Sequence, residues 1–253
     1  MPCDLFSLAG RNALVTGSRQ GIGAAIAAAL AAAGADVACH GRHAEAGEAL
    51  ERIRGLGRRA FYFAADLAEP QACAALVERA AAALGSVDIL VNNAGAIRRA
   101  PAAEYAGEDW EALLAVNLSA VFRLSQLAGR GMLARGAGKI INLASLLSFQ
   151  GGIRVPAYAA AKGGVAQLTK ALANEWAARG VNVNAIAPGY IATANTAALR
   201  ADPERSRQIL ERIPAGRWGE PRDVAGAAVF LASPAADYIH GHVLAVDGGW
   251  LAR

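Results

Sequence analysis

Residues 12–23 read NALVTGSRQGIG, an apolar strand pattern followed by a glycine-rich turn and an alanine-rich helical pattern. Gly17, Gly21 and Gly23 have the spacing Gly-x3-Gly-x-Gly, which is wider at its start than Gly-x-Gly-x-x-Gly. Glycines let a backbone turn sharply and approach a pyrophosphate, and a helix that follows offers free N–H groups and a positive dipole end. The turn therefore predicts a phosphate-binding loop between a first strand and a first helix.

Strand-like and helix-like segments alternate along the rest of the chain. Short apolar runs predict strands at residues 12–15, 36–40, 59–64, 87–91, 139–143, 181–187 and 242–246. Helical patterns between them cover residues 21–33, 44–56, 70–84, 109–134, 157–179 and 220–232. This alternation predicts a parallel sheet of about seven strands with helices on both faces. Since no linker-like break appears, we expect a single doubly wound, Rossmann-like α/β domain over residues 1–253.

Two segments interrupt the alternation. Residues 190–214 follow a predicted strand without containing another, and an insertion at the carboxyl end of a strand is where a substrate lid would lie. After the last strand, Trp250 and Leu251 would be costly to leave in water, so we expect a partner subunit to cover them.

Composition narrows the class of protein. The net charge is +4, and no segment concentrates like charges, so we expect neither a nucleic-acid-binding arm nor a membrane-binding patch. Residues 1–10 lack the pattern of a signal peptide, and residues 21–35 are too short and too weakly apolar to span a bilayer. Cys3, Cys39 and Cys73 lack metal-like spacing, which predicts no metal site and a reducing, cytoplasmic compartment.

The second strand ends in Cys39-His40-Gly41-Arg42, where an NAD-binding protein usually places Asp or Glu against the ribose hydroxyls. Arg42 stands beside that place, and an arginine there can stack on adenine and pair with a 2′-phosphate. Arg19 adds a second positive charge. The prediction is an NAD(P) site that favours NADP(H), with NAD left open. Asp66 and Leu67, after the third strand, are expected at the adenine edge.

Tyr158 and Lys162 are four residues apart in a helical pattern and so share a helix face. An ammonium group near a phenol lowers the pKa of the phenol toward working pH, where it can exchange protons with an alcohol or carbonyl oxygen. Ser145 ends the fifth strand, at the edge of a parallel sheet that carries chemistry, and is expected to hydrogen-bond the reacting oxygen. Ser148 is a rival for that role. Only three of the 25 Lys and Arg residues are lysines, which singles out Lys162 beside Lys139 and Lys170.

Other candidates follow the fourth and sixth strands. Asn93, Ala94 and Gly95 leave room for a cofactor, and Asn117 is unfavourable within a helix unless it makes a specific hydrogen bond. Cofactor contacts are expected from a larger set: Gly17, Ser18, Arg19, Gly21, Ile22, Gly23, Arg42, Asp66, Leu67, Asn93, Ala94, Gly95, Tyr158, Lys162, Pro188, Gly189, Ile191 and Thr193.

Together these motifs resemble the short-chain dehydrogenase/reductase family over essentially the whole chain. The resemblance implies hydride transfer between a nicotinamide cofactor and an alcohol or carbonyl, a sheet commonly of seven strands, and a homotetramer. It also implies roles: Tyr158 as general acid/base, Lys162 as the group that lowers its pKa and binds the nicotinamide ribose, Ser145 as the group that polarises the substrate oxygen, and Asn117 as the holder of a water in a proton relay.

Three stretches, residues 92–99, 147–156 and 248–253, resemble a narrower group, the 2-dehydro-3-deoxy-D-gluconate 5-dehydrogenases, also called 2-deoxy-D-gluconate 3-dehydrogenases. That resemblance implies a sugar-acid substrate. Its carboxylate needs a cation, for which Arg98, Arg99 and Arg154 are candidates, and Gln150 is a candidate for a hydroxyl group. Arg42 departs from the acid expected of an NAD enzyme.

Two other functions remain open at this point. One is a 3-oxoacyl-[acyl-carrier-protein] reductase, for which Arg123, Arg130 and Arg135 would form a basic patch. The other is a dinucleotide-sensing protein without catalysis, against which the complete set of Asn117, Ser145, Tyr158 and Lys162 argues.

Overall fold

The computed structural model describes residues 4–47 and 49–253. Cys3 and Glu48, the latter inside the helix predicted at residues 44–56, lie outside the described residues. Cys39 and Cys73 are buried free thiols.

The strands form one parallel sheet in the order β3-β2-β1-β4-β5-β6-β7, which confirms the predicted doubly wound α/β fold. Their bounds are β1 (Asn12–Val15), β2 (Asp36–Gly41), β3 (Ala60–Ala64), β4 (Ile89–Asn92), β5 (Gly138–Leu143), β6 (Val181–Pro188) and β7 (Val243–Val246). The strand order changes direction between β1 and β4, so a crevice is expected at the carboxyl ends of these two strands.

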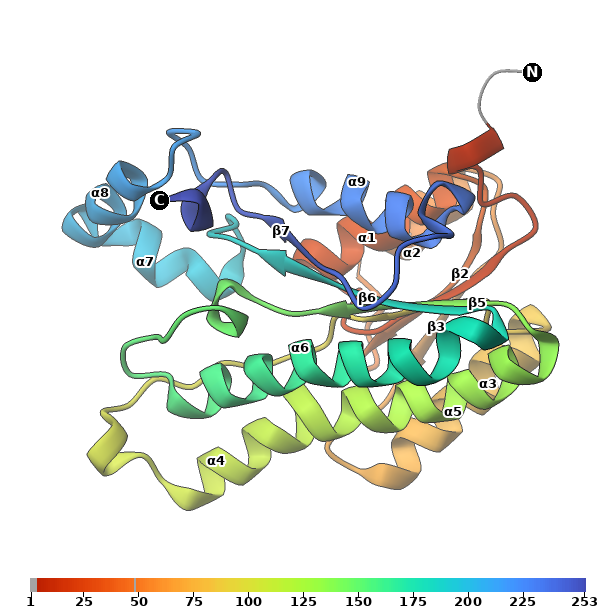
Figure 1. Cartoon of the computed structure of the whole chain (residues 1–253), viewed down its shortest axis with the longest axis horizontal. Helices are drawn as coiled ribbons and strands as arrows, with labels where there is room; N and C mark the ends of the chain where they lie inside the picture. The colour runs from red at the N-terminus through yellow and green to blue at the C-terminus, as the bar shows by residue number, and fades with distance from the viewer. Residues whose placement is uncertain (1–3, 48) are drawn as a thin grey trace.

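Helices cover both faces of the sheet (Figure 1). One face carries α1 (Gly21–Ala32), α2 (Ala49–Gly55) and α9 (Pro221–Ala232), and the other carries α3 (Pro70–Leu84), α4 (Gly107–Leu114), α5 (Ala120–Arg135) and α6 (Pro156–Trp176). Successive strand residues serve opposite layers. In β1, Ala13 and Val15 pack with α1 and α9, whereas Leu14 packs with α3 and α5. Strands that are buried on both faces have continuous runs of apolar residues, and for this reason the sequence pattern predicted their positions.

Two helix predictions need correction. Of the helix expected at residues 44–56, α2 (Ala49–Gly55) is described, and residues 44–47 are not helical: Gly47 adopts a left-handed φ of +71° and lies close to the carbonyl of Arg19. The helix expected at residues 109–134 is interrupted by a π-helical turn, Ala115–Ser119, between α4 and α5. The insertion at residues 190–214 contains two helices that the sequence analysis did not predict, α7 (Ala197–Ala201) and α8 (Pro203–Arg212).

The helical segment Gly107–Arg135, of which the π-helical turn is part, is by length and composition apolar enough to cross a membrane, and its most apolar stretch of 18 residues has a mean hydropathy of 1.3. In this fold its α5 portion lies between the sheet and neighbouring helices, where Leu124, Ala128 and Met132 are buried with residues of α3 and α6. Burial against the protein's own core accounts for this composition.

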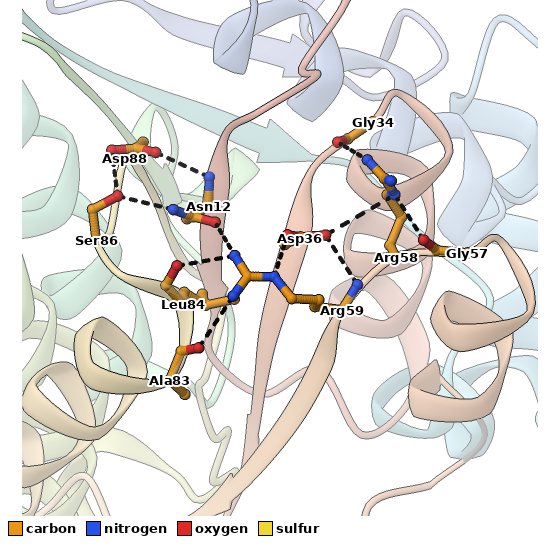
Figure 2. Close-up of polar contacts among 10 residues, drawn as sticks. All are labelled: Asn12, Gly34, Asp36, Gly57, Arg58, Arg59, Ala83, Leu84, Ser86 and Asp88. Atoms are coloured by element: carbon orange, nitrogen blue, oxygen red, sulfur yellow. Dashed lines mark hydrogen bonds and ion pairs between the residues drawn. The ribbon is translucent and has the colours of Figure 1, made fainter.

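A polar network closes the amino end of the sheet around Arg59 (Figure 2). The guanidinium donates to Asp36 Oδ2 at 2.6 Å and to the carbonyls of Leu84 and Ala83, at the end of α3, at 3.0 and 3.4 Å. It also reaches Asn12 Oδ1 at 3.4 Å. Burial alone would raise the pKa of Asp36, but the hydrogen bonds and charge of Arg59 lower it below its ordinary value. One side chain thus ties β1, β2 and α3 together, far from the carboxyl edge of the sheet.

Candidate active site

The glycine-rich loop between β1 and α1 is shaped by close backbone approach. A Cβ on Gly23 would lie 2.3 Å from the carbonyl oxygen of Gly17, and a Cβ on Gly17, whose φ is +62°, would lie 2.8 Å from the Cα of Ala94. Gln20, at the helix N-cap, makes no capping bond with its side chain, so the first N–H groups of α1 remain available to an anion. A cradle that only glycine fits, next to free amides, suits a dinucleotide pyrophosphate.

Asn93 joins this loop to the far side of the strand switch. Its Nδ2 donates to the carbonyl oxygens of Thr16 and Gly17, both at 2.9 Å. The Thr16 hydroxyl accepts in turn from the backbone N–H groups of Asn93 and Ala94 at 3.0 Å. The carboxyl ends of β1 and β4 are therefore fixed to each other at the crevice where α/β sheets bind ligands.

The residues expected at the adenine end lie together beyond β2 and β3. Arg42 Nε and Asp66 Oδ2 form an ion pair at 3.1 Å, in which both side chains remain exposed. Gly41 has no room for a side chain, because the Tyr62 hydroxyl lies 2.3 Å from the place of its Cβ. Leu67 is buried beside Asp66, while Arg19 is exposed on the glycine-rich loop.

Ser145, Tyr158 and Lys162 meet beyond the carboxyl end of β5, with Tyr158 and Lys162 on the first turns of α6. Burial raises the pKa of Tyr158, while a hydrogen bond with Ser145 and the positive charge of Arg99 lower it. Lys162 is 4 % exposed, and its Nζ donates to the Leu143 carbonyl at 2.5 Å while lying 5.6 Å from the centre of the Tyr158 ring. Burial lowers the pKa of Lys162 to about 8.

This geometry sharpens two sequence-based expectations. The rival Ser148 donates its hydroxyl proton to the carbonyl of Lys162 on α6 at 2.7 Å, which favours Ser145 for the contact with substrate, and this choice stays a prediction. The positive charge of Arg99 lowers the pKa of the Tyr158 phenol, and Lys162 Nζ donates to the Leu143 carbonyl at the end of β5 while lying 5.6 Å from the centre of the Tyr158 ring. The pKa-lowering role expected for Lys162 stays a prediction.

Asn117 lies in the π-helical turn and is fully buried. Its side chain bonds both polar groups of Ala96: Oδ1 accepts from the Ala96 N–H at 2.8 Å and Nδ2 donates to the Ala96 carbonyl at 2.7 Å. Gly95 permits this, since a Cβ there would lie 2.9 Å from Asn117 Oδ1. The specific hydrogen-bonding role expected of a mid-helix asparagine is present. π-turns of this kind occur often at functional sites.

The four substrate candidates have different surroundings. Arg98 Nε pairs with Asp109 Oδ1 at 3.0 Å, whereas Arg99 is exposed and its charge lowers the pKa of Tyr158. Arg154 has a left-handed φ of +63°, and its carbonyl accepts from Ala100 N–H at 3.0 Å, which joins the loops after β4 and β5. A left-handed backbone is uncommon for a residue with a Cβ and occurs often at ligand sites.

Gln150 belongs to a contact between the lid segment and the end of the chain. Its Oε1 accepts from Trp250 Nε1 at 3.3 Å and from an Arg212 guanidinium nitrogen at 3.5 Å. The Arg212 guanidinium lies 4.1 Å from the centre of the Trp250 ring, and Tyr190 packs on the same ring at 4.7 Å. Trp250 is only 4 % exposed, because residues of its own chain, among them Ile209 and Ile213 of the segment 190–214, cover the indole. Leu251 is half-buried, and its cover by a partner subunit stays a prediction.

The remaining cofactor candidates lie at the end of β6 and in the segment that follows it. Pro188 ends β6, and Gly189 lies so close to Asp247 that a Cβ would be 2.6 Å from its Cα. Ile191 is buried, and the methyl group of Thr193 lies 3.6 Å from the place of a Cβ on Gly21. The segment after β6 therefore approaches the glycine-rich loop. Sequence reasoning assigned no role to Arg212 or to His40, a buried residue at the end of β2.

Comparisons with known proteins place the whole chain among oxidoreductases. The family model described as enoyl-(acyl carrier protein) reductase matches residues 17–251. A 2-dehydro-3-deoxy-D-gluconate 5-dehydrogenase of Bacillus subtilis (strain 168) is 56% identical over 253 residues, covering 99% of this chain and 98% of that protein.

Two solved structures superpose over nearly the whole chain. One, from Agrobacterium tumefaciens, is described as a 2-deoxy-D-gluconate 3-dehydrogenase with bound NADP; it has a TM-score of 0.93 and 57% identity and covers 99% of this chain and 100% of its own. The other, from Beutenbergia cavernae, is described as an NAD(P)-dependent gluconate 5-dehydrogenase with bound NADP at low occupancy. It has a TM-score of 0.95 and 57% identity, covering 98% and 100% of the two chains.

Proposed function

Because the chain belongs to the short-chain dehydrogenase/reductase family, we propose that it oxidises or reduces a sugar acid of the 2-dehydro-3-deoxy-D-gluconate type with NADP(H). Membership makes it an oxidoreductase that acts on CH–OH donors. The observation that carries the proposal is the position of Lys162, whose Nζ lies 5.6 Å from the centre of the Tyr158 ring on α6 and donates to the Leu143 carbonyl at the end of β5, two residues before Ser145. The names and bound NADP of the relatives support the substrate class and the cofactor.

The cofactor would lie across the carboxyl ends of β1 and β4. Its pyrophosphate would rest on Gly17, Gly21 and Gly23, where added side chains have no room or would be strained. At the adenine end, Arg42 would exchange part of its pairing with the Asp66 carboxylate for a 2′-phosphate, which is the more highly charged anion. When bound, the nicotinamide supplies or accepts the hydride.

The protein's own groups manage the proton. In the reducing direction, Tyr158 donates its phenolic proton to the carbonyl oxygen of the substrate, which Ser145 holds by a hydrogen bond. Arg99 favours the phenolate that remains. Lys162 would bind the nicotinamide ribose, and Asn117 would keep the turn beside Ala96 in place for a water-borne proton relay.

Arg99 and Arg154 are the proposed contacts for the substrate carboxylate. Arg98 is the weaker candidate, because Asp109 already holds its guanidinium at 3.0 Å. Gln150 would reach a hydroxyl group only by sharing the oxygen that now accepts from Trp250 and Arg212. We also propose a cytoplasmic homotetramer that binds neither nucleic acid nor membrane and needs no metal.

A turnover panel of uronate-derived keto acids, gluconates and neutral sugars, each with NADP and with NAD, tests this function. We expect turnover of the sugar acids with NADP and at least about a hundredfold loss in Tyr158→Phe. Arg99→Met should raise the KM for the sugar acid at least about tenfold but should not raise the KM for a neutral analogue. The matched variant Arg98→Met should keep the KM for the sugar acid within about threefold of the wild-type value. Equal turnover of acids and neutral sugars would contradict the substrate class.

The matched family description favours one second candidate, an acyl-carrier-protein reductase. Acetoacetyl thioesters belong in the same panel for that reason. The basic patch that such a function would need on α5 is weakened here, because Arg135 is engaged with the Val87 carbonyl at 2.9 Å and with Asp88 at 3.3 Å. Faster turnover of the thioesters than of any sugar acid would favour this alternative.

A further inference from the structure

His40 lies at the end of β2 and connects the two halves of the proposed cofactor site. Its imidazole is 2 % exposed, with Nδ1 at 3.2 Å from the backbone nitrogen of Gly17 and Nε2 at 3.0 Å from the carbonyl oxygen of Ala65. Gly17 opens the glycine-rich loop, and Ala65 precedes the Asp66 that pairs with Arg42. One side chain therefore touches both the phosphate end and the adenine end.

The partners of the ring fix its tautomer. A backbone N–H can only donate, so Nδ1 must be the acceptor toward Gly17; a carbonyl can only accept, so Nε2 must carry the proton. The two contacts are satisfied together by the neutral imidazole with its proton on Nε2. An imidazolium would place a second donor against the Gly17 N–H and lose that bond.

The backbone of the same residue reinforces the link. The Ser18 N–H donates to the His40 carbonyl at 2.8 Å, and the His40 N–H donates to Ser18 Oγ at 3.0 Å. Gly17 and Ser18 are thus held to β2, while the N–H groups of the first turn of α1 stay free for a phosphate.

We propose that His40 is a positioning residue for cofactor binding: in its neutral form it holds the Gly17 peptide in the conformation that accepts the dinucleotide phosphate. The inference rests on the proposed cofactor. Burial lowers the pKa of His40, which favours the neutral form, while the Ala65 contact and the Asp66 charge oppose that shift. Other titratable groups at these strand ends are Arg42, Arg19 and Tyr62, the last two lying against Gly41.

A pair of amide variants separates the two contacts of the ring. His40→Asn places an oxygen near the position of Nδ1 and keeps an acceptor for Gly17, whereas His40→Gln places its amide near Nε2 and keeps a donor for Ala65. We expect His40→Asn to bind NADPH within about threefold of wild type at pH 7.5, and His40→Gln to bind about tenfold or more weakly. NADPH fluorescence titration without substrate measures both, and cooperative melting of each variant checks that it is folded.

Two further readouts distinguish positioning from a general structural role. As the pH falls from 8 through the lowered pKa of His40, followed by NMR of the imidazole, the ratio of wild-type Kd to His40→Asn Kd should rise by at least about threefold, because protonation removes the Gly17 acceptor only where histidine is present. The phosphate of NADPH titrates in the same range but cancels in this ratio. In the cofactor-free protein, amide hydrogen exchange at Gly17 should be faster in His40→Gln than in His40→Asn.

Equal NADPH affinity of the two variants, or a Kd ratio that stays constant while the His40 imidazole is seen to become protonated, would overturn the inference while leaving the proposed function intact. If wild type bound neither NADPH nor NADH, the proposed function would fail and this inference with it.

Discussion

Removing the Trp250 side chain should release the predicted lid, residues 190–214, while leaving the cofactor site in place. The indole is buried among Leu146, Ile209 and Ile213, is stacked by Arg212 at 4.1 Å, and donates to Gln150. Truncation of a buried tryptophan to alanine costs about 3–5 kcal/mol. If most of that is lost from the docking of α8, the ratio of closed to open lid falls at least about a hundredfold, since each ~1.4 kcal/mol is a factor of ten.

The assay compares substrate kinetics with cofactor affinity and backbone exchange. Trp250→Ala should raise substrate KM, leave the Kd for NADPH within about threefold, and accelerate amide exchange in α8 while the exchange of β5 is unchanged. Trp250→Phe keeps an aromatic ring for Arg212 and loses mainly the hydrogen bond to Gln150, so its effect should be smaller, by about 1 kcal/mol of docking. Trp110→Ala, on α4 and 38 % exposed, is the matched control.

Unchanged exchange in α8 together with an unchanged KM would refute the reasoning. So would equal acceleration throughout the sheet, because that result would locate the loss in global stability.

Three more outcomes follow from the fold and the site. Arg59→Ala should lower the free energy of unfolding by about 1–2 kcal/mol at neutral pH, a melting shift of roughly 2–8 °C in calorimetry. Because the pKa of Asp36 is depressed in the folded protein, the difference in stability between wild type and variant should shrink as the pH falls below about 4 and through that lowered pKa. A stability difference that stays constant with pH would contradict the pairing of Arg59 with an ionised Asp36. Gly23→Ala should weaken NADPH binding by more than about tenfold, measured by titration, since its Cβ would meet backbone at 2.3 Å; wild-type affinity would show that the loop can shift. Arg99→Met should move the rising limb of the pH profile for alcohol oxidation to higher pH, because it removes a charge that lowers the pKa of Tyr158, and an unmoved limb would count against that charge.

The sheet and its main helices were predictable because their signal is local. Buried parallel strands read as short apolar runs, and the bounds of β1 and α3 agree with the sequence prediction to the residue. Helix α8 was missed because it is strongly polar, and on its surface Arg207 pairs with both Glu204 and Glu211. A signal for α8 was available: Asp202 caps the helix and Pro203 occupies its first position, which is a recognised start pattern.

The site depends in part on contacts that local sequence patterns do not predict. Tyr158 and Lys162 are four residues apart, so their common helix face follows from helical geometry. The hydrophobic periodicity around Asn117 predicts an uninterrupted α-helix, whereas the structure has a π-helical turn there. The one sequence signal for an irregularity was the asparagine in the middle of the predicted helix. Trp250 and His40 acquire their partners across 100 and 23 sequence positions, distances over which a single sequence gives no pairing signal. Arg98 differs from Arg99 in being paired with Asp109, and this pairing likewise depends on the position of α4.

The Asn93 amide has a consequence for how the chain assembles. It fixes carbonyls of the glycine-rich loop from 77 and 76 positions further along the chain. During synthesis, a chain that has emerged only as far as β3 contains every glycine of the loop but lacks the side chain that holds it. Competence to bind a dinucleotide should therefore appear late, after β4 has been inserted beside β1. Cofactor added to a refolding reaction would then capture molecules in which the two halves of the sheet have already joined, and would select against chains with an unpaired first half.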